Sequence, residues 1–258
     1  GDVYKRQLMF LPDFQNKYGQ GSAGNAATSM GDISTGSWGP IADGSPQLYM
    51  DGTIRPYTIQ ENNVSKFFET GVKSINSITV DTSTENSSYR FSYTNNDTST
   101  ILPGTSLKSH NFNLRGTADL GDKLSIDTKV TYFSQRIEGK ARTGGEGVVP
   151  LVMNMPRTVD SADLMNYQKE NPASPADYSV LSYGKRPSQT GNPYWMMFHD
   201  VDDDKRDRFF GFTKLNYEFN DWLSGFVRIG ADITNAGLYT IRQAGHHWLS
   251  LIHISEPT

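Results

Sequence analysis

The sequence predicts an all-β fold, in which antiparallel strands in up-and-down order form part of the wall of a large transmembrane β-barrel with long extracellular loops. Apolar and polar side chains alternate with a period of two along several segments, as in a strand with two different faces. The connections between these segments alternate between short and long, as they do in outer-membrane barrels. In addition, only 36% of the 258 residues are hydrophobic and 12% are aromatic, which is a thin apolar content for a globular enzyme.

The chain divides by composition into two parts. Residues 8–72 are rich in Gly, Ser, Asn and Thr and sustain no apolar period, so we expect a loop-rich early barrel segment there. Residues 73–248 carry the strand pattern and should contain the barrel strands and extracellular loops.

Roughly six strands are expected after residue 73. The clearest begins at Leu124, where apolar or neutral side chains at even positions alternate with Ser125, Asp127 and Lys129. The same alternation begins at about residue 75 and recurs in residues 89–93, 112–120, 213–219 and 223–232.

Two kinds of connection separate these strands. Short turns are expected at residues 84–86, 121–122 and 220–221, where Gly, Asn and Asp gather. Long polar segments are expected from 95 to 108 and from 135 to about 206. In an outer-membrane barrel the short turns are periplasmic, so Phe219 and Trp222 would lie in the periplasmic aromatic girdle.

A soluble antiparallel sandwich, acting as a surface or secreted glycan-binding module, is the alternative, because its strands alternate in the same way. A strand that runs from 124 to 134 is long for a sandwich, and a connection from 135 to 206 is long for a compact domain. These lengths favour the barrel. No stretch approaches the roughly 18 consecutive apolar residues of a membrane helix, and the absence of cysteine excludes disulfides and thiolate chemistry.

The two terminal segments, 1–7 and 249–258, are expected to be translations of a DNA-sequencing adapter. GDVYKRQ and LSLIHISEPT are what the adapter and its reverse complement encode. We therefore expect residues 8–248 to be the natural part of an internal fragment of a longer protein.

Several phrases of the sequence resemble one family. They are Phe67-Phe68-Glu69-Thr70-Gly71, Tyr89-Arg90-Phe91-Ser92-Tyr93, Asn113-Leu114-Arg115, Asp122-Lys123-Leu124, Ser37-Trp38-Gly39-Pro40 and Asn192-Pro193-Tyr194-Trp195. These phrases are similar to the early barrel of SusC/RagA-type TonB-linked outer-membrane proteins. The resemblance covers nearly all of residues 8–248. It departs from the family at 100–104, where TILPG stands in place of the common Gly-Ile-x-Pro-Asn form.

The resemblance implies a TonB-dependent receptor in the cell outer membrane. Such a protein imports oligosaccharides or peptides, is driven by the TonB complex, and works with a SusD-like lipoprotein. It is not an enzyme, and it needs no cofactor and no nucleic acid. The TonB-box and the plug that the family uses for energy coupling have no counterpart in these residues.

Two groups of residues are candidates for function. Tyr194, Trp195 and His199 form a dense aromatic cluster that could contact substrate, because flat rings pack on sugar rings. Packing inside a folded loop is at least as good an explanation. The second group falls on the polar side of the alternating strands, where charge would face the barrel lumen or the plug: Arg90, Arg115, Lys129, Arg228 and Asp232.

Catalytic and metal sites have little support. The acidic run at 200–207 offers carboxylates for calcium, but interleaved Lys and Arg favour a solvated rim of an extracellular loop. His246 and His247 are adjacent, so on a strand they would point to opposite faces and could not share a metal. A glycoside hydrolase would need two carboxylates about 5–9.5 Å apart across a cleft, and no such pair stands out.

Overall fold

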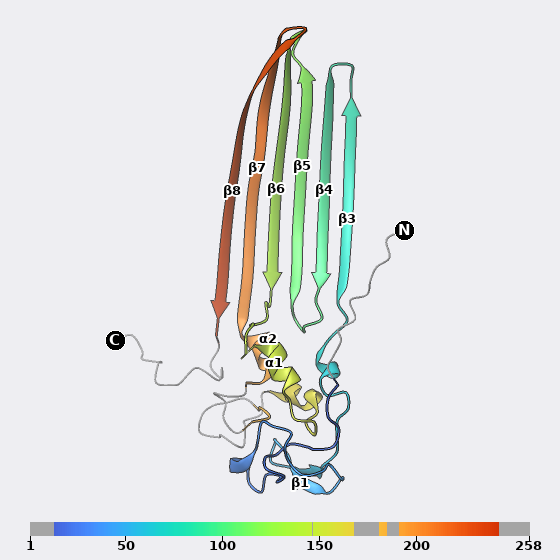
Figure 1. Cartoon of the computed structure of the whole chain (residues 1–258), viewed down its shortest axis with the longest axis vertical. Coiled ribbons are helices and arrows are strands. Elements are labelled where there is room, and N and C mark those ends of the chain that lie inside the picture. The colour runs from blue at the N-terminus through green and yellow to red at the C-terminus, as the bar shows by residue number, and fades with distance from the viewer. Residues whose placement is uncertain (1–12, 146, 168–180, 185–190, 243–258) are drawn as a thin grey trace, which may run out of the picture.

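A computed structural model of the chain describes residues 13–145, 147–167, 181–184 and 191–242. Its main feature is a six-stranded antiparallel sheet in which each strand pairs with the next one along the chain (Figure 1). The strands are β3 (Val72–Ser83), β4 (Ser87–Ser99), β5 (Ser106–Asp119), β6 (Leu124–Glu138), β7 (Val201–Asn220) and β8 (Leu223–Ile241). The all-β class and the up-and-down order are confirmed. The sheet is open, with β3 and β8 at its two edges.

Three tight turns lie together at one end of the sheet, which we call the hairpin end (Figure 1). They connect β3 to β4, β5 to β6 and β7 to β8, as the sequence predicts. Gly121, in the β5–β6 turn, has a φ of +126°, a conformation that favours glycine because it has no Cβ.

At the opposite end the strands run further than the sequence predicts. The expected long segment at 95–108 is wrong: β4 continues to Ser99 and β5 begins at Ser106. The connection that was expected from 135 to about 206 shrinks to residues 139–200 for the same reason. In these extensions the face that is apolar nearer the hairpin end carries polar residues, as where Asp97 pairs with Lys108. The alternation disappears there although the backbone ladder continues.

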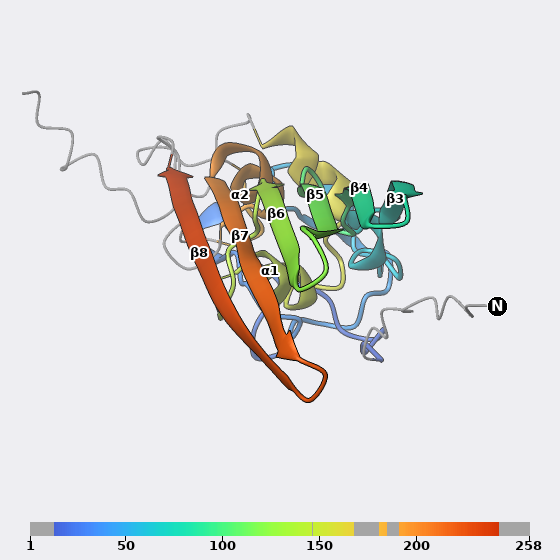
Figure 2. The same ribbon diagram turned by 90° about the horizontal axis from the view of Figure 1, so that it is seen from above.

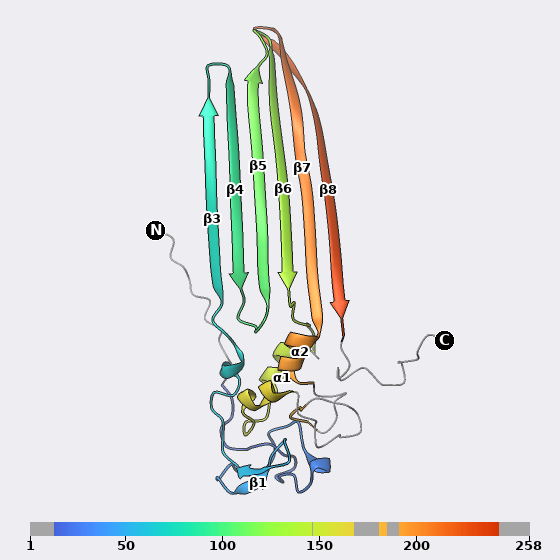
Figure 3. The ribbon, with the colours of Figure 1, turned by 180° about the vertical axis from the view of Figure 1, so that it is seen from behind.

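The remaining residues form a compact unit at that end, which we call the cap (Figure 3). It combines the described parts of residues 13–71 and 139–200. Its elements are η1 (Met30–Asp32), β1 (Pro46–Leu48), β2 (Ile54–Pro56), η2 (Ser65–Phe67), α1 (Val148–Met153), η3 (Ser161–Asn166) and α2 (Pro193–His199). Far from being an open polar loop, the segment between β6 and β7 shares a hydrophobic core with residues that precede β3, including Met50, Phe67, Val152, Leu164 and Met196.

A buried arginine joins three segments of the cap. Arg157 is 4% exposed. Its guanidinium donates to the carbonyl oxygen of Gln15 at 3.2 Å, to that of Glu61 at 3.1 Å, and to the amide oxygen of Asn63. Burial lowers the pKa of Arg157, and the charge of Glu61 opposes that shift. Because buried polar groups need partners, Arg157 fixes how these segments meet.

The two faces of the six-stranded sheet differ along its whole width. On the apolar face, Val80, Phe91, Leu114 and Val130 lie in one register row across β3 to β6. On the polar face the corresponding positions are taken mostly by Ser, Thr, Asn and charged residues. Seen from above, the strands form a layer one strand thick (Figure 2). Among the described residues no second sheet covers the apolar face, which the sandwich alternative would require.

Within the described ranges, the structure contains no helix that is both long and apolar enough to cross a membrane.

Candidate functional site

Three of the five charged residues predicted to share a face form one row across the middle of the sheet. Arg90 on β4 lies opposite Arg115 on β5, and Arg115 lies opposite Lys129 on β6. Arg228 and Asp232 stand on the same polar face of β8, two positions on either side of Gly230, which shares this register row through Phe212. The five residues therefore occupy one continuous surface.

Carboxylates on neighbouring strands hold part of this charge. Arg115 makes two hydrogen bonds to Asp127, at 3.1 and 2.9 Å. Arg208 binds Asp232 in the same two-pronged way, and Arg90 binds Asp81. Such exposed pairs contribute little to stability, but two parallel hydrogen bonds fix the orientation of a guanidinium.

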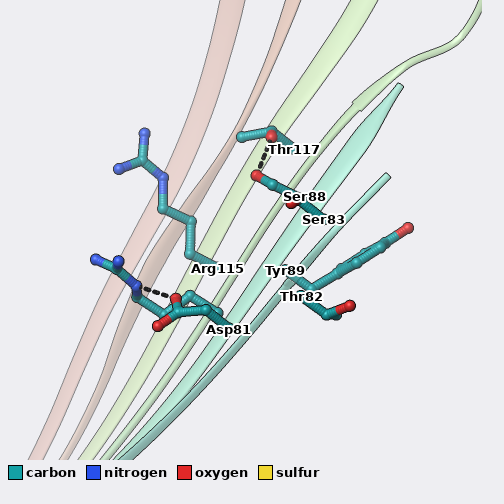
Figure 4. A pocket seen from close by; sticks show the side chains of 8 residues that line it. Asp81, Thr82, Ser83, Ser88, Tyr89, Arg115 and Thr117 are labelled. Atoms are coloured by element: carbon teal, nitrogen blue, oxygen red, sulfur yellow. Dashed lines mark hydrogen bonds and ion pairs between the residues drawn. The ribbon is translucent and has the colours of Figure 1, made fainter. Parts of the chain in front are cut away.

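A hollow of about 440 Å³ lies between the polar residues of β3, β4 and β5 near the hairpin end. Figure 4 shows Ser88 bonded to Thr117, with Arg115 and Asp81 on the same side of the strands and Tyr89 and Thr82 pointing to the other. The distance between the two hydroxyl oxygens of Ser88 and Thr117 is 2.7 Å. The two cations that line this hollow, Arg90 and Arg115, are already paired with carboxylates, so the hollow offers a ligand no unpaired positive charge.

A second hollow of about 430 Å³ lies on β6, β7 and β8 and is chemically different. Lys129, Arg228 and Asp232 line it together with Phe210, Phe212 and Gly230. The Arg228 guanidinium lies 3.8 Å from the centre of the Phe212 ring, within the range of a cation–π contact. Sequence reasoning placed the charges here but missed the phenyl rings, which also fall on the polar positions of β7.

The predicted aromatic cluster lies on α2, whose start is fixed locally. The Asn192 side chain accepts hydrogen bonds from the backbone N–H groups of Tyr194 and Trp195, at 2.8 and 3.2 Å. Pro193 follows at the first helical position, where its missing N–H costs nothing. The Asn192 amide also donates to the carbonyl oxygens of Leu164 and Leu181, both at 2.8 Å, so it anchors α2 in the cap.

The three residues of that cluster do not share one surface. Tyr194 is 4% exposed and packs on Phe67 with ring centroids 4.8 Å apart, so it belongs to the cap core. Trp195 and His199 are half-buried and stack on each other at 4.0 Å. Tyr167 meets the His199 ring edge-on at 5.1 Å. Two of the three residues predicted to contact substrate, Trp195 and His199, thus form a stacked, half-buried pair on α2.

The acidic residues from Asp202 onward are not on a loop rim but at the start of β7, and Asp200 ends α2 just before it. Asp202 binds Arg242 at 2.8 Å, and Asp203 lies 3.5 Å from Arg136. Asp204 faces Lys140 at 3.8 Å. Basic side chains thus surround these carboxylates, and in the part of the chain that the structure describes no group of His, Asp and Glu could hold a metal ion.

The cap contains a further cavity, of about 670 Å³, beside Trp38. The Trp38 side chain is 74% exposed, while its backbone is held by hydrogen bonds to Gly21 and Gly24 at 3.2 and 2.8 Å. Gln15, Ser37 and Asn154 supply polar groups to the lining. An exposed tryptophan inside a Gly-rich segment was the available signal for this cavity, and sequence reasoning did not use it.

Some predictions fall on residues outside the described ranges: both terminal segments, 1–7 and 249–258, and the pair His246 and His247. No family model matches the chain, and no curated protein matches it either.

Proposed function

We propose that this chain is a segment of the barrel wall of a TonB-dependent outer-membrane transporter. The parent protein imports oligosaccharides or peptides with a SusD-like lipoprotein as its partner and the TonB complex as its source of energy. In this proposal the apolar face contacts outer-membrane lipid, the polar face lines the lumen or contacts the plug, and the cap is extracellular. The resemblance described above and the surface chemistry of the sheet support it.

The observation that carries the proposal is the exposed apolar face. Large hydrophobic side chains on all six strands are exposed there, including Ile78 at 58%, Leu114 at 54% and Ile229 at 74%. Soluble monomers rarely expose contiguous apolar patches beyond a few hundred Å². Lipid is a solvent in which such a face is stable.

The apolar face is bounded at both ends as a membrane band would be. Towards the cap, a row of aromatic rings crosses the strands, with Tyr93 and Phe112 at a centroid distance of 4.7 Å and Phe112 and Tyr132 at 6.2 Å. Beyond this row the same face carries Lys108, Arg136 and Lys205. At the hairpin end Trp222 is 81% exposed. Aromatic girdles at both margins are typical of outer-membrane barrels.

The height of the band also fits. At about 3.3 Å per residue, the stretch of β6 from Leu124 to Tyr132 spans roughly 26 Å along the strand. A strand tilt of about 40° would reduce this to roughly 20 Å, close to the ~25 Å apolar band of known barrels.

A matched pair of lysine substitutions tests the proposal. Leu114→Lys puts a charge in the middle of the apolar face, and Ser92→Lys puts one on the polar face of the neighbouring strand. A lysine at the bilayer midplane costs about 2–4 kcal/mol, so Leu114→Lys should lower the fraction of refolded chain that inserts into lipid vesicles at least tenfold. Ser92→Lys should leave insertion nearly unchanged.

The sandwich alternative gives the opposite results. A soluble glycan-binding module would fold in aqueous buffer without lipid or detergent, and flotation with vesicles would leave it in the unbound fraction. Equal effects of the two lysines on insertion would also contradict the proposal, because the two faces would then not meet different solvents.

A further inference from the structure

The polar face of β7 and β8 carries cations laid over phenyl rings, which is unusual in a surface otherwise made of small polar residues. Arg228 lies 3.8 Å from the Phe212 ring, Lys214 lies 4.4 Å from Phe226, and Arg208 lies 4.7 Å from Phe210. All these rings and cations occupy even positions of the two strands, so they share the polar face. Phe226 is 66% exposed, although an apolar ring gains nothing from water.

Three cations at or beside the second hollow, Lys129, Lys214 and Arg228, have no carboxylate within 4.0 Å among the described residues, and the same holds for Arg206 and Lys73 further along this face. Salt bridges occupy Arg90, Arg115 and Arg208 instead. The chain as a whole has a formal net charge of −4, so the positive surplus is local. It is concentrated around the hollow of about 430 Å³ that Lys129 and Arg228 line.

Gly230, in the middle of β8, lines this hollow. It pairs with Phe212, and a Cβ at this position would lie 3.1 Å from the carbonyl oxygen of Gly211 and 3.6 Å from the Cβ of Phe212. Asp232, the one carboxylate in the lining, is neutralised by two hydrogen bonds to Arg208. The volume is within the range of small-ligand sites, about 300–1,000 Å³.

The arrangement of Arg228 suits an oxyanion. A guanidinium whose Cζ lies over an aromatic ring still carries its N–H donors in its own plane, where a carboxylate can accept two of them. The Lys129 ammonium supplies a further positive charge from β6, which is separated from Arg228 on β8 by β7. Neither group has to leave an existing ion pair to bind a ligand.

We propose that this hollow binds a carboxylate group carried by the transported molecule, so that the substrate is an acidic oligosaccharide or an acidic peptide. This inference rests on the proposed function, because it takes the polar face to be the lumen. The acidic oligosaccharide and the acidic peptide would both present a carboxylate that Lys129 and Arg228 bind together. The experiment below distinguishes these two kinds of substrate.

The test uses the full chain refolded in zwitterionic micelles, with its β-sheet content checked by circular dichroism. Calorimetry compares an oligouronate, a neutral oligosaccharide of equal length, a peptide rich in glutamate, and the same peptide with glutamine in place of glutamate. The variants are Lys129→Gln and Arg228→Gln, with Lys129→Arg to restore the charge. Lys73→Gln removes a charge from the same face at the distant edge strand β3 and is the matched control.

We expect at least one of the two acidic ligands to bind and both neutral ones to fail. Lys129→Gln and Arg228→Gln should each weaken binding about tenfold or more, while Lys129→Arg and Lys73→Gln stay within about threefold of the unmodified chain. Binding should also weaken as salt is raised. Whichever acidic ligand binds identifies the source of the carboxylate.

Two results would overturn the inference. Acidic ligands that bind equally well to Lys129→Gln and Arg228→Gln would place the anion elsewhere. If neither acidic ligand binds, the free cations must serve contacts with another segment of polypeptide. Lipid insertion of the same preparation is measured in parallel, so a failure here with insertion intact leaves the proposed function standing.

Discussion

Replacing Arg157 by methionine should open the cap while leaving the sheet intact. Methionine keeps much of the side-chain volume but removes every hydrogen bond of the guanidinium. The carbonyl oxygens of Gln15 and Glu61 and the amide oxygen of Asn63 would lose their donor. Each buried group left without a partner costs about 1–3 kcal/mol. The sum is about 3–5 kcal/mol, since some of these groups can turn towards water.

Hydrogen–deuterium exchange of the refolded chain measures this loss directly. A loss of 3 kcal/mol accelerates exchange through local opening by more than about 100-fold. The reporting amides are Gln60, which donates to the carbonyl of residue 157 at 2.8 Å, and Phe67, which donates to Val64 at 3.2 Å. Amides in the middle of β5 should not change.

Lys66→Met is the matched control for this experiment. Lys66 binds Asp160 at 2.8 Å and joins two of the same segments, but it is 44% exposed. An exposed pair of this kind contributes about 0–1 kcal/mol, so cap exchange should rise less than about fivefold. If Arg157→Met changed cap exchange no more than Lys66→Met does, the buried guanidinium would not be what holds the cap together.

Three further predictions concern the cap. Asn192→Ala removes both the N-cap of α2 and two buried donors, so the free energy of opening at α2 amides should fall by about 2–4 kcal/mol and their exchange should accelerate. Unchanged exchange would refute the anchoring role. Gly39→Ala places a Cβ 2.5 Å from the Tyr57 hydroxyl, so thermal scans should show a clear loss of cap stability, whereas Gly237→Ala, with nothing within 4 Å, should show none. Burial raises the pKa of Asp160, but its hydrogen bonds from Lys66 and from a backbone N–H outweigh this and leave the pKa lowered. The Asp160 carboxylate therefore stabilises the cap fully above the ordinary carboxyl pKa of about 4. This stabilisation is lost as the pH falls through the lowered pKa of the folded chain. The free energy of cap opening, obtained from exchange rates divided by the intrinsic rate at each pH, should consequently fall more between pH 6 and pH 3 in the unmodified chain than in Asp160→Asn.

The strands could be predicted from sequence because their signal is local. Leu124 to Tyr132 alternates cleanly, since apolar or neutral side chains take one face of β6 and polar or charged side chains take the other. The same rule placed Arg90, Arg115 and Lys129 on one face without knowledge of the register. The rule failed beyond the aromatic row, because the strand positions that continue the apolar face there are polar, as at Asp97 and Lys108.

The contacts between strands could not be predicted. Asp81, Asp127 and Arg208 are the partners of predicted site residues, but they lie 9, 12 and 24 residues away from them along the chain. These pairs depend on the turn lengths and on the register between strands. A register shift of one residue would move every side chain of a strand to the opposite face and break the pairs.

The helices of the cap were missed for two different reasons. α2 had an available signal, Asn192 followed by Pro193, which marks the start of a helix. α1 had none, because its six residues are almost all apolar and so short a run shows no helical period.

Single-cysteine scanning of β6 tests the central claim that the two faces of the sheet meet different solvents. The chain has no cysteine of its own, so each variant carries one reactive site. Chain reconstituted in lipid vesicles is treated with a water-soluble maleimide at Ser125→Cys, Ile126→Cys, Lys129→Cys and Val130→Cys. The account predicts rapid labelling at 125 and 129 and protection at 126 and 130 that disappears when the lipid is removed. Equal labelling at all four positions, or protection of 126 and 130 that persists in aqueous buffer without lipid, would contradict it.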